Sequence, residues 1–435
     1  MLNRRREKEN YSEQNDYRAR DRATCIWPSR CKPQRCGSTS EQLRRSDRTV
    51  DFSGRADQVP RFSACCLIVE IRTDYYQPSD APDKPVRLKL SYCGCLYADL
   101  GCFAWDDYLD HRRTTLGPDA IVLLAEFGEW QEQPAPSVLD CEEATRKRTI
   151  VFSLFSAGVL IAEGSERHLR EERLLSSWSR WSPAARYFHY GTRSDHGTSF
   201  VPPEEHRRTL MESLPQSPPP PAFVPLQGTY LELPTDAEDD LWKSHSLVEA
   251  LEKRRSYRAF TKGSVSLRTL STLLKLTGGV VDIRERTQTV FKRSPSGGGR
   301  HPTEIYICAM LIEDLVPGIY RYLPKEHGLA LVGAVPRREV LIDACGSQSW
   351  IADANFMLFY TSILARNIWK YKTARSYRTL LLDVGHLDQT LLLTAAALGL
   401  GATFTAALRD EAVEEILACD LTTELVMGCA VVGTL

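Results

Sequence analysis

The sequence predicts an α+β fold for its C-terminal half, preceded by a smaller domain of helices and short strands. Between residues 226 and 435, apolar runs of strand length alternate with amphipathic helical patterns. The glycine fingerprint that opens a Rossmann domain is missing after the first strand pattern. We therefore expect helices and strands that are mixed around one central sheet.

Composition divides the chain into four segments. Residues 1–58 are polar and rich in Arg, Ser, Asp and Gln, so they cannot bury enough apolar surface to offset their ordering entropy, and we expect a disordered extension. Residues 59–200 are the expected first domain. Residues 201–225 are a proline-rich linker of extended conformation, with four consecutive prolines, and residues 226–435 are the main domain.

The first domain carries short apolar runs and one long helical pattern. We expect strands or short buried segments at ACCLIVEIR, VRLKLSYCGCLY and DAIVLLAEF. The stretch EEATRKRTIVFSLFSAGVLIAEGSE predicts an amphipathic helix that breaks at Gly158 and leads into a hairpin. A helix followed by a β wing indicates a small winged-helix-like or peptide-clamp domain.

The main domain opens with two helical patterns, DDLWKSHSLVEALEKRRSYRAF and SVSLRTLSTLLKLTGG. In the second, Ser266 is the expected N-cap and Gly278 the stop. The helix around His386 is apolar on nearly all faces, which predicts burial centrally or against another subunit. Further helices are expected at REVLIDACGSQSWIADA, YRTLLLDVGHLDQTLLLTAAALGLG and EAVEEILA, and strands at EIYICAMLIE, NFMLFYTSI and LVMGCAVVGTL.

Charge and cysteine content exclude several classes of function. The 55 Lys and Arg residues almost balance the 56 Asp and Glu residues, so no global basic field favours nucleic acid. No apolar run suits a membrane span or a secretion signal, and we expect a cytoplasmic protein. The 13 cysteines stand mostly in apolar contexts and predict buried reduced thiols. Cys93, Cys95 and Cys102 lack a fourth ligand at metal-site spacing, so no metal is expected.

Three separated segments carry binding chemistry. KRRSYRAF places Arg254 and Arg258 on one helical face, with Arg255 and Ser256 alongside, and converging guanidinium groups bind a dianionic phosphate. Taken alone, this run also fits a solvated helix face. PSGGGRHP offers backbone N–H groups without steric cover to a flat heteroaromatic ring, although glycines alone also fit a flexible loop. ALGLGATFTAAL leaves the long helix and offers further backbone donors.

These segments, together with PGIYRYLP and GHLDQ, resemble the nitroreductase superfamily, and within it the SagB-type dehydrogenases, the azoline oxidases of modified-peptide biosynthesis. The resemblance covers the whole C-terminal domain. It implies a nitroreductase-like FMN-binding fold, with a central mixed sheet and flanking helices, and a homodimer.

The resemblance also implies FMN contacts in three groups. The family often has Pro and Gly in the last group, where this chain has Phe404 and Ala406. The phosphate and ribityl contacts are Arg254, Arg255, Ser256 and Arg258; the loop that covers the flavin across the dimer interface is Pro295, Ser296, Gly297, Gly298 and Gly299; the turn after the long helix is Ala402, Thr403, Phe404, Thr405 and Ala406.

WKYKTARSYR contains the Lys-Tyr pair that the resemblance implies for catalysis, Lys370 and Tyr371. Aromatising an azoline removes a hydride and a ring proton, and the proton needs a base. Tyrosine has a pKa of about 10, and we expect the neighbouring ammonium to lower it. A surface pair without function is the alternative. For His386 we expect a core or interface role, with Asp383 and Gln389 as partners.

The resemblance thus implies an FMN-dependent dehydrogenase that oxidises thiazolines or oxazolines in a ribosomally made precursor peptide, with a cyclodehydratase as a further partner. The first domain would hold a leader peptide or that partner. Two alternatives stay open: a generic NAD(P)H-dependent nitro- or quinone reductase of the same fold, and a scaffold without enzymatic activity.

Overall fold

The structure is a computed structural model, and the part of the chain that it describes leaves several gaps. The expected disordered extension lies outside the described residues, and only two residues of the run ACCLIVEIR lie within them. The described residues are 69–70, 86–99, 102–133, 141–194, 200–226, 228–235, 246–420 and 422–435.

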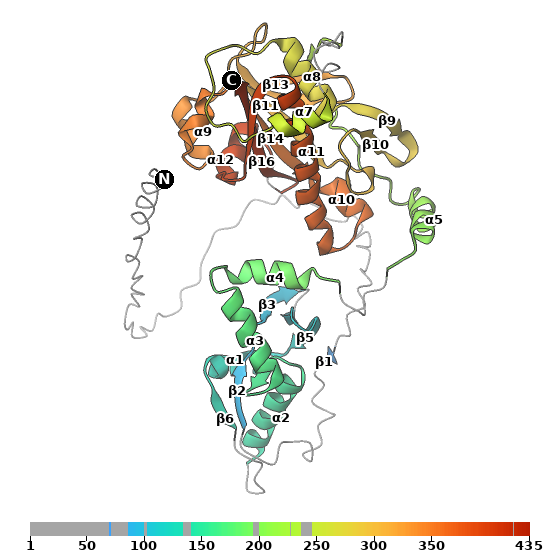
Figure 1. Cartoon of the computed structure of the whole chain (residues 1–435). Coiled ribbons are helices and arrows are strands. Elements are labelled where there is room, and N and C mark those ends of the chain that lie inside the picture. Colours follow the sequence, from blue (N-terminus) through green and yellow to red (C-terminus); the bar gives the residue numbers. More distant parts are fainter. Residues whose placement is uncertain are drawn as a thin grey trace, which may run out of the picture. The chain divides into compact units, whose positions relative to one another are not determined.

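The described part of the first domain contains short strands in two sheets and four α-helices (Figure 1). One sheet has the order β1-β5-β4-β3 and the other β6-β2-β7. This agrees with the small domain of helices and strands that the sequence predicts, although the four-stranded sheet was not expected. The elements are β1 (Val69–Glu70), β2 (Val86–Leu90), β3 (Gly94–Asp99), β4 (Cys102–Asp107), β5 (Arg112–Leu116), α1 (Pro118–Leu124), β6 (Gln131–Gln133), α2 (Glu142–Ser156), β7 (Leu160–Ala162), α3 (Glu166–Ser177) and α4 (Pro183–Gly191).

Two local predictions for this domain are wrong. DAIVLLAEF forms helix α1 and a 3₁₀ turn, because Pro118 at the first helical position favours a helix start and Leu123 and Leu124 then share one buried side. Gly158 does end helix α2 with a φ of 79°, but β7 pairs with β2 and not with a neighbouring strand. Periodicity could not reveal a strand partner so distant in sequence.

The linker is only partly extended. Helix α5 (Pro203–Ser213) occupies its first half, with Pro203 in the first turn and Glu204 and Glu205 placed favourably near the positive end of the helix dipole. Residues 214–226, which include the four prolines, form no helix or strand. The composition therefore predicts the conformation of the second half alone.

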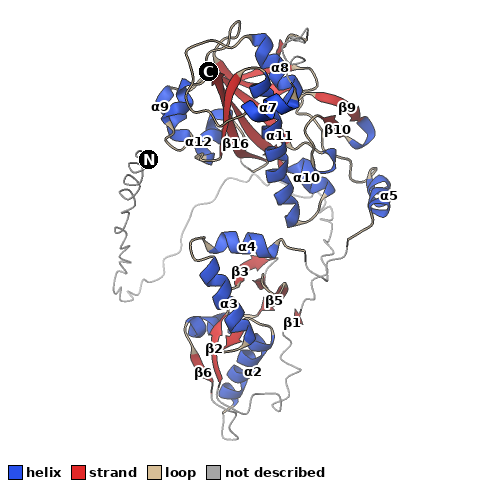
Figure 2. Cartoon of the chain, in the orientation of Figure 1, coloured by secondary structure: helices blue, strands red, loops and turns tan. Residues whose placement is uncertain are grey.

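The main domain is built on a seven-stranded sheet of order β15-β16-β14-β11-β12-β13-β8 (Figure 2). The named strands of this sheet pair antiparallel throughout. Among the described residues, the parallel component of the expected mixed sheet is limited to isolated bridges, Ser256 with Ala402 at the β15 edge and Val265 with Ile312. The strands are β8 (Leu231–Glu232), β11 (Thr303–Ala309), β12 (Gly318–Leu323), β13 (Gly328–Gly333), β14 (Phe356–Ile363), β15 (Leu400–Thr405) and β16 (Glu424–Thr434); β9 (Val280–Arg284) and β10 (Thr289–Lys292) form a separate ribbon.

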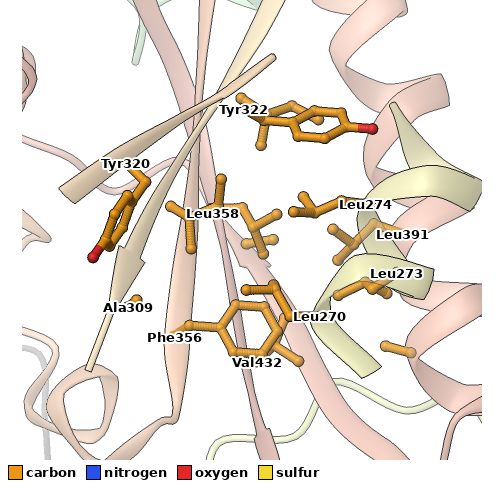
Figure 3. Close-up of a cluster of buried hydrophobic side chains, with 14 of the residues drawn as sticks. Leu270, Leu273, Leu274, Ala309, Tyr320, Tyr322, Phe356, Leu358, Leu391 and Val432 are labelled. Atoms are coloured by element: carbon orange, nitrogen blue, oxygen red, sulfur yellow. The ribbon is translucent and has the colours of Figure 1, made fainter. Parts of the chain in front are cut away.

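Helices cover both faces of this sheet, which explains why every residue of β11 is buried. Ile305 and Ile307 pack on the side of α8 and α11, while Tyr306 and Cys308 pack on the side of α9 and α12. Figure 3 shows leucines of α8 and α11 against Phe356, Leu358 and Val432 of the sheet. The helices are α7 (Leu247–Lys253), α8 (Leu267–Thr277), α9 (Arg338–Ala344), α10 (Leu364–Lys370), α11 (Tyr377–Ala397) and α12 (Asp410–Leu417).

Capping residues fix several boundaries as the sequence predicts. The Ser266 side chain accepts a hydrogen bond from the Thr269 backbone N–H at 3.0 Å, and Gly278 ends α8. The run REVLIDACGSQSWIADA is not one helix, because Gly346 and Ser347 have φ values of 65° and 61° and interrupt it after α9. Among the described residues, no helix is both long and apolar enough to cross a membrane.

Candidate active site

The predicted arginine segment lies beside the edge strand β15. Helix α7 ends at Lys253, so the prediction of Arg254 and Arg258 on one helical face is wrong. The chain continues as an extended segment instead, in which Ser256 forms a parallel bridge with Ala402 and the Tyr257 N–H donates to the Ala402 carbonyl at 3.2 Å. Two of the three predicted segments therefore meet, through backbone hydrogen bonding.

The third predicted segment is a strand for most of its length. Helix α11 ends at Ala397, the chain turns at Gly399, and Ala402–Thr405 belong to β15; only Ala406 follows the strand. The expected turn at 402–406 is therefore wrong. The Phe404 ring stacks on the Tyr360 ring at 6.4 Å, and Thr403 Oγ1 is buried without a hydrogen-bond partner.

A fourth segment, the loop Cys345–Trp350, also contacts these residues, and sequence reasoning missed it. Gln348 Nε2 donates to Thr405 Oγ1 and to the Cys345 carbonyl, each at 2.9 Å. The Arg258 guanidinium lies over the Trp350 ring, 5.8 Å from its centre. The sequence signal for this loop was the Gly346-Ser347 pair inside a helical pattern, and the structure shows that the helix is interrupted there.

The glycine loop has a fixed shape, as its prolines and the following strand predict. Gly298 and Gly299 have φ values of 67° and 65°, which strongly favour glycine. Ser296 Oγ donates to Asp383 Oδ2 at 2.6 Å, and the Gly297 N–H donates to Asp383 Oδ1 at 3.1 Å. A carboxylate of α11 therefore holds the loop in place.

Asp383 thus has a different role from the one predicted, as a partner of His386. His386 and Gln389 are exposed on α11, so the predicted core position of His386 is wrong within this chain. Asp383 is only 5% exposed. Burial raises the pKa of its carboxyl, and the hydrogen bonds from Ser296 and Gly297 oppose this rise. The signal that could have found it is an acid in a mostly apolar helix, three residues before His386; Asp388 is the other acid of this helix.

The structure brings Lys370 and Tyr371 to the glycine loop. Lys370 Nζ donates to the Gly298 carbonyl at 3.3 Å. A Cβ atom on Gly298 would lie 2.5 Å from Lys370 Nζ and 2.6 Å from Tyr371 Oη, so the absence of a side chain there makes room for the pair. Both side chains are half-buried, which argues against a functionless surface pair.

Helix α10, which ends at Lys370, is anchored by a buried ion pair that sequence reasoning also missed. Arg366 Nη1 donates to Glu304 Oε1 at 2.5 Å and to the His301 carbonyl at 3.0 Å. Both side chains are at most 7% exposed. The Arg366–Glu304 ion pair holds helix α10 against the segment that follows the glycine loop. It therefore fixes the position of the Lys370 backbone at the end of that helix.

The electrostatics of the pair differ from the prediction. Burial raises the pKa of Tyr371, and the nearby Asp383 raises it further, while Arg300 opposes this rise. Burial and then the positive charge of Arg300 lower the pKa of Lys370. The expected lowering of the tyrosine pKa by its neighbouring ammonium is therefore wrong, because the phenolate loses more by desolvation. Lys370 is the group whose neutral, proton-accepting form is favoured.

The two groups of residues suit different parts of FMN. Arg255 and Arg258 are exposed next to β15, and no described carboxylate pairs with them, so they remain available to a phosphate. The glycine loop offers bare backbone where a flat ring would lie. Among the described residues, no hydrogen bond joins the Arg254–Arg258 segment or β15 to the glycine loop.

Comparison with known proteins identifies relatives of the main domain. A protein from Methanocaldococcus jannaschii that is named as a nitroreductase is 33% identical over 171 residues, which cover 39% of this chain and 83% of that protein. A trifolitoxin-processing protein from Rhizobium leguminosarum is 30% identical over 145 residues, or 32% of this chain and 39% of that protein.

Among solved structures, one described as a nitroreductase from Ralstonia eutropha has 23% sequence identity and a TM-score of 0.40, covering 49% of this chain and 93% of its own. The model of the nitroreductase family matches residues 251–434. The chain therefore belongs to the nitroreductase family, whose members are oxidoreductases that use FMN.

Proposed function

We propose that this enzyme is a SagB-type dehydrogenase that oxidises azolines to azoles in a ribosomally made peptide. The placement of Lys370 and Tyr371 at the bare backbone of Gly298 is the observation that carries the proposal. The motifs PSGGGRHPTE and GHLDQ support it, as does the 30% identity to a protein named for the processing of a peptide toxin.

The reaction sets a clear demand on the protein. Conversion of a thiazoline or oxazoline to its azole removes two hydrogens from the ring, one as a hydride and one as a proton. Bound FMN supplies the two-electron acceptor, and oxygen restores its oxidised form. The chain must supply the base and hold the ring in place.

Lys370 suits the base and Tyr371 suits the orienting group. Burial and the positive charge of Arg300 lower the pKa of Lys370, which makes its amine a better candidate base than an unperturbed lysine. The raised pKa of Tyr371 keeps its hydroxyl protonated, and this hydroxyl can donate a hydrogen bond to the ring heteroatom or the peptide. Asp383 and Ser296 keep the loop beneath the pair in one conformation.

FMN would be held by the residues that the sequence predicts. Arg255 and Arg258, with Arg254 and Ser256 alongside, would bind the phosphate and ribityl groups, and the loop Pro295–Gly299 and the segment Ala402–Ala406 would line the ring. From the family resemblance we expect a homodimer in which a second copy completes each site. A homodimer would also cover apolar side chains that are exposed in one chain, including Leu247 at 66% and Leu382 at 60%.

A peptide substrate gives the first domain a role. Residues 59–200 would hold a leader peptide or a cyclodehydratase, and the linker 201–225 would connect them to the FMN domain at 226–435. The precursor peptide and its modifying enzymes are made in the cytoplasm, where we expect this enzyme to act.

Two substitutions test the proposal. Lys370→Ala or Tyr371→Phe should keep the flavin absorbance but reduce azoline oxidation about 100-fold or more, because general base catalysis contributes about 10²–10⁴-fold. Lys372→Ala is the matched control, since Lys372 is an exposed lysine two residues away. The assay follows the loss of two hydrogens from an azoline peptide by mass spectrometry. Full activity in both substituted proteins would remove the pair from the mechanism.

A generic NAD(P)H-dependent reductase is the second candidate, favoured by the 33% identity to a protein named as a nitroreductase. Such an enzyme would reduce its bound flavin rapidly with NADPH. Stopped-flow absorbance therefore separates the two candidates. Rapid bleaching by NADPH, with no change in mass of an azoline peptide, would favour the reductase.

A further inference from the structure

Arg300 is a buried charge next to the proposed catalytic pair that the mechanism has not used. It follows Gly299 directly and is only 3% exposed. Its Nη2 donates to the carbonyls of Thr287 and Gln288 at 2.8 and 2.5 Å, and to Thr289 Oγ1 at 3.2 Å. These acceptors lie at the turn between β9 and β10, so the guanidinium is held in one place by the ribbon.

The same guanidinium also contacts helix α10. Its central carbon lies 5.1 Å from the centre of the Trp369 ring, the residue immediately before Lys370. Trp369 is itself fixed, because its indole N–H donates to the Ser217 carbonyl at 3.0 Å. Arg300 therefore links the glycine loop, the β9–β10 ribbon and the end of α10.

Burial of the Arg300 guanidinium destabilises the folded protein, so we expect this charge to have a function. A buried cation without a counter-ion is unfavourable, and no carboxylate among the described residues forms an ion pair with Arg300. Its Nε is buried and has no hydrogen-bond partner in the described structure, which is unfavourable for a polar donor. Anchoring the ribbon alone would need neither the charge nor the unpaired donor.

We propose that Arg300 is a positioning residue of the active site, whose fixed positive charge tunes Lys370 and Tyr371 and whose contact with Trp369 holds them at the glycine loop. This inference rests on the proposed function of the pair. The charged and titratable groups around the pair are Arg300 of the glycine loop, Arg366 of α10, Asp383 of α11, and the two residues themselves.

The direction of the effect follows from the charge. A positive group disfavours the protonated amine of Lys370 and favours the phenolate of Tyr371, so Arg300 lowers the pKa of Lys370 and opposes the rise in that of Tyr371. Removal of the charge should raise both pKa values. The acidic limb of the pH–rate profile should then move to higher pH, whichever of the two groups accepts the proton.

Substitutions can separate the charge from the contacts. Arg300→Met and Arg300→Gln remove the charge, and the glutamine keeps one amide donor for the ribbon carbonyls if the methionine protein does not fold. Arg300→Lys keeps the charge but loses the planar group with several donors. Arg293→Met, at an exposed arginine seven residues earlier, is the control for loss of one positive charge.

The measurement needs neither peptide substrate nor turnover. The full-length holoenzyme is treated with an amine-selective acylating reagent across a pH series, and the modification of Lys370 is quantified by mass spectrometry relative to exposed Lys372. We expect the midpoint of Lys370 modification to rise by about one pH unit in Arg300→Met and Arg300→Gln. It should stay near the original value in Arg300→Lys and Arg293→Met.

Two results would overturn the inference: an unchanged midpoint in both neutral variants, or an equal shift in Arg300→Lys. Because labelling does not depend on azoline oxidation, the proposed function is tested separately by Lys370→Ala. If the proposed role of Lys370 is wrong, Lys370→Ala will oxidise the peptide at the full rate. The labelling shift in the neutral Arg300 variants will still be present in that case.

Discussion

Replacement of Gly298 by alanine tests whether the glycine loop is bare in order to admit Lys370 and Tyr371. The new Cβ would lie 2.5 Å from Lys370 Nζ, 2.8 Å from Lys370 Cδ and 2.6 Å from Tyr371 Oη. Gly299→Ala is the matched variant. Its φ of 65° is close to the 67° of Gly298, but its Cβ would meet the Thr289 side chain at 2.6 Å.

Both substitutions introduce backbone strain, but the new Cβ atom meets different side chains in the two proteins. A left-handed φ costs about 1–2 kcal/mol for alanine, so each protein should melt a few degrees lower. In Gly298→Ala, the tips of Lys370 and Tyr371 must also retreat by about 1 Å to reach an ordinary contact distance of about 3.5 Å. A displacement of that size in a reacting group costs about 100-fold in rate.

Thermal unfolding, flavin absorbance and azoline oxidation are measured on both proteins. We expect similar melting temperatures, retained flavin, and an oxidation rate that is about 100-fold lower in Gly298→Ala than in Gly299→Ala. The comparison cancels the backbone strain that is common to both and leaves a difference in side-chain contacts, with Lys370 and Tyr371 in Gly298→Ala and with Thr289 in Gly299→Ala. Equal rates in the two proteins would refute the reasoning.

Two further predictions concern the surroundings of the site. Gln348→Ala removes the hydrogen bond to Thr405 Oγ1 and the one to the Cys345 carbonyl that holds Gln348 in place, so the Kd for FMN should rise about tenfold in a fluorescence titration. Ser349→Ala at the exposed neighbour should leave the Kd unchanged, and an unaltered Kd in Gln348→Ala would contradict this role. Burial raises the pKa of Asp388 from 3.8 to about 7, against its hydrogen bond from Tyr360. Between pH 3.8 and about pH 7 the folded state binds more protons than the unfolded state. The contribution of Asp388 to the free energy of unfolding therefore decreases as pH rises through this range. Above about pH 7 that contribution is fully lost. Asp388→Asn should remove about 2–3 kcal/mol of the stability difference between pH 5 and pH 8 in urea unfolding, and identical pH dependence in both proteins would show that the carboxyl is not perturbed.

Local sequence signals predict much of the main domain. Ser266 and Gly278 mark the ends of α8 because capping depends on residues within a turn of the boundary. The runs that became β11 and β14 predict buried strands because helices cover both sheet faces. The same local reasoning fails at Arg254, where a helical spacing continues but the bridge from Ser256 to Ala402 draws the chain away from the helix.

The sequence by itself also predicted which residues should form the site, because the glycine loop, the arginine segment and the Lys-Tyr pair are short motifs that carry a family resemblance. Only the tertiary structure decided that Asp383 holds the glycine loop, that Gln348 contacts Thr405, that Arg300 links the loop to the β9–β10 ribbon, and that the pKa of Tyr371 is raised and not lowered. These outcomes depend on desolvation and on contacts between residues far apart in the chain. Neither quantity is encoded in the spacing of residues along the sequence.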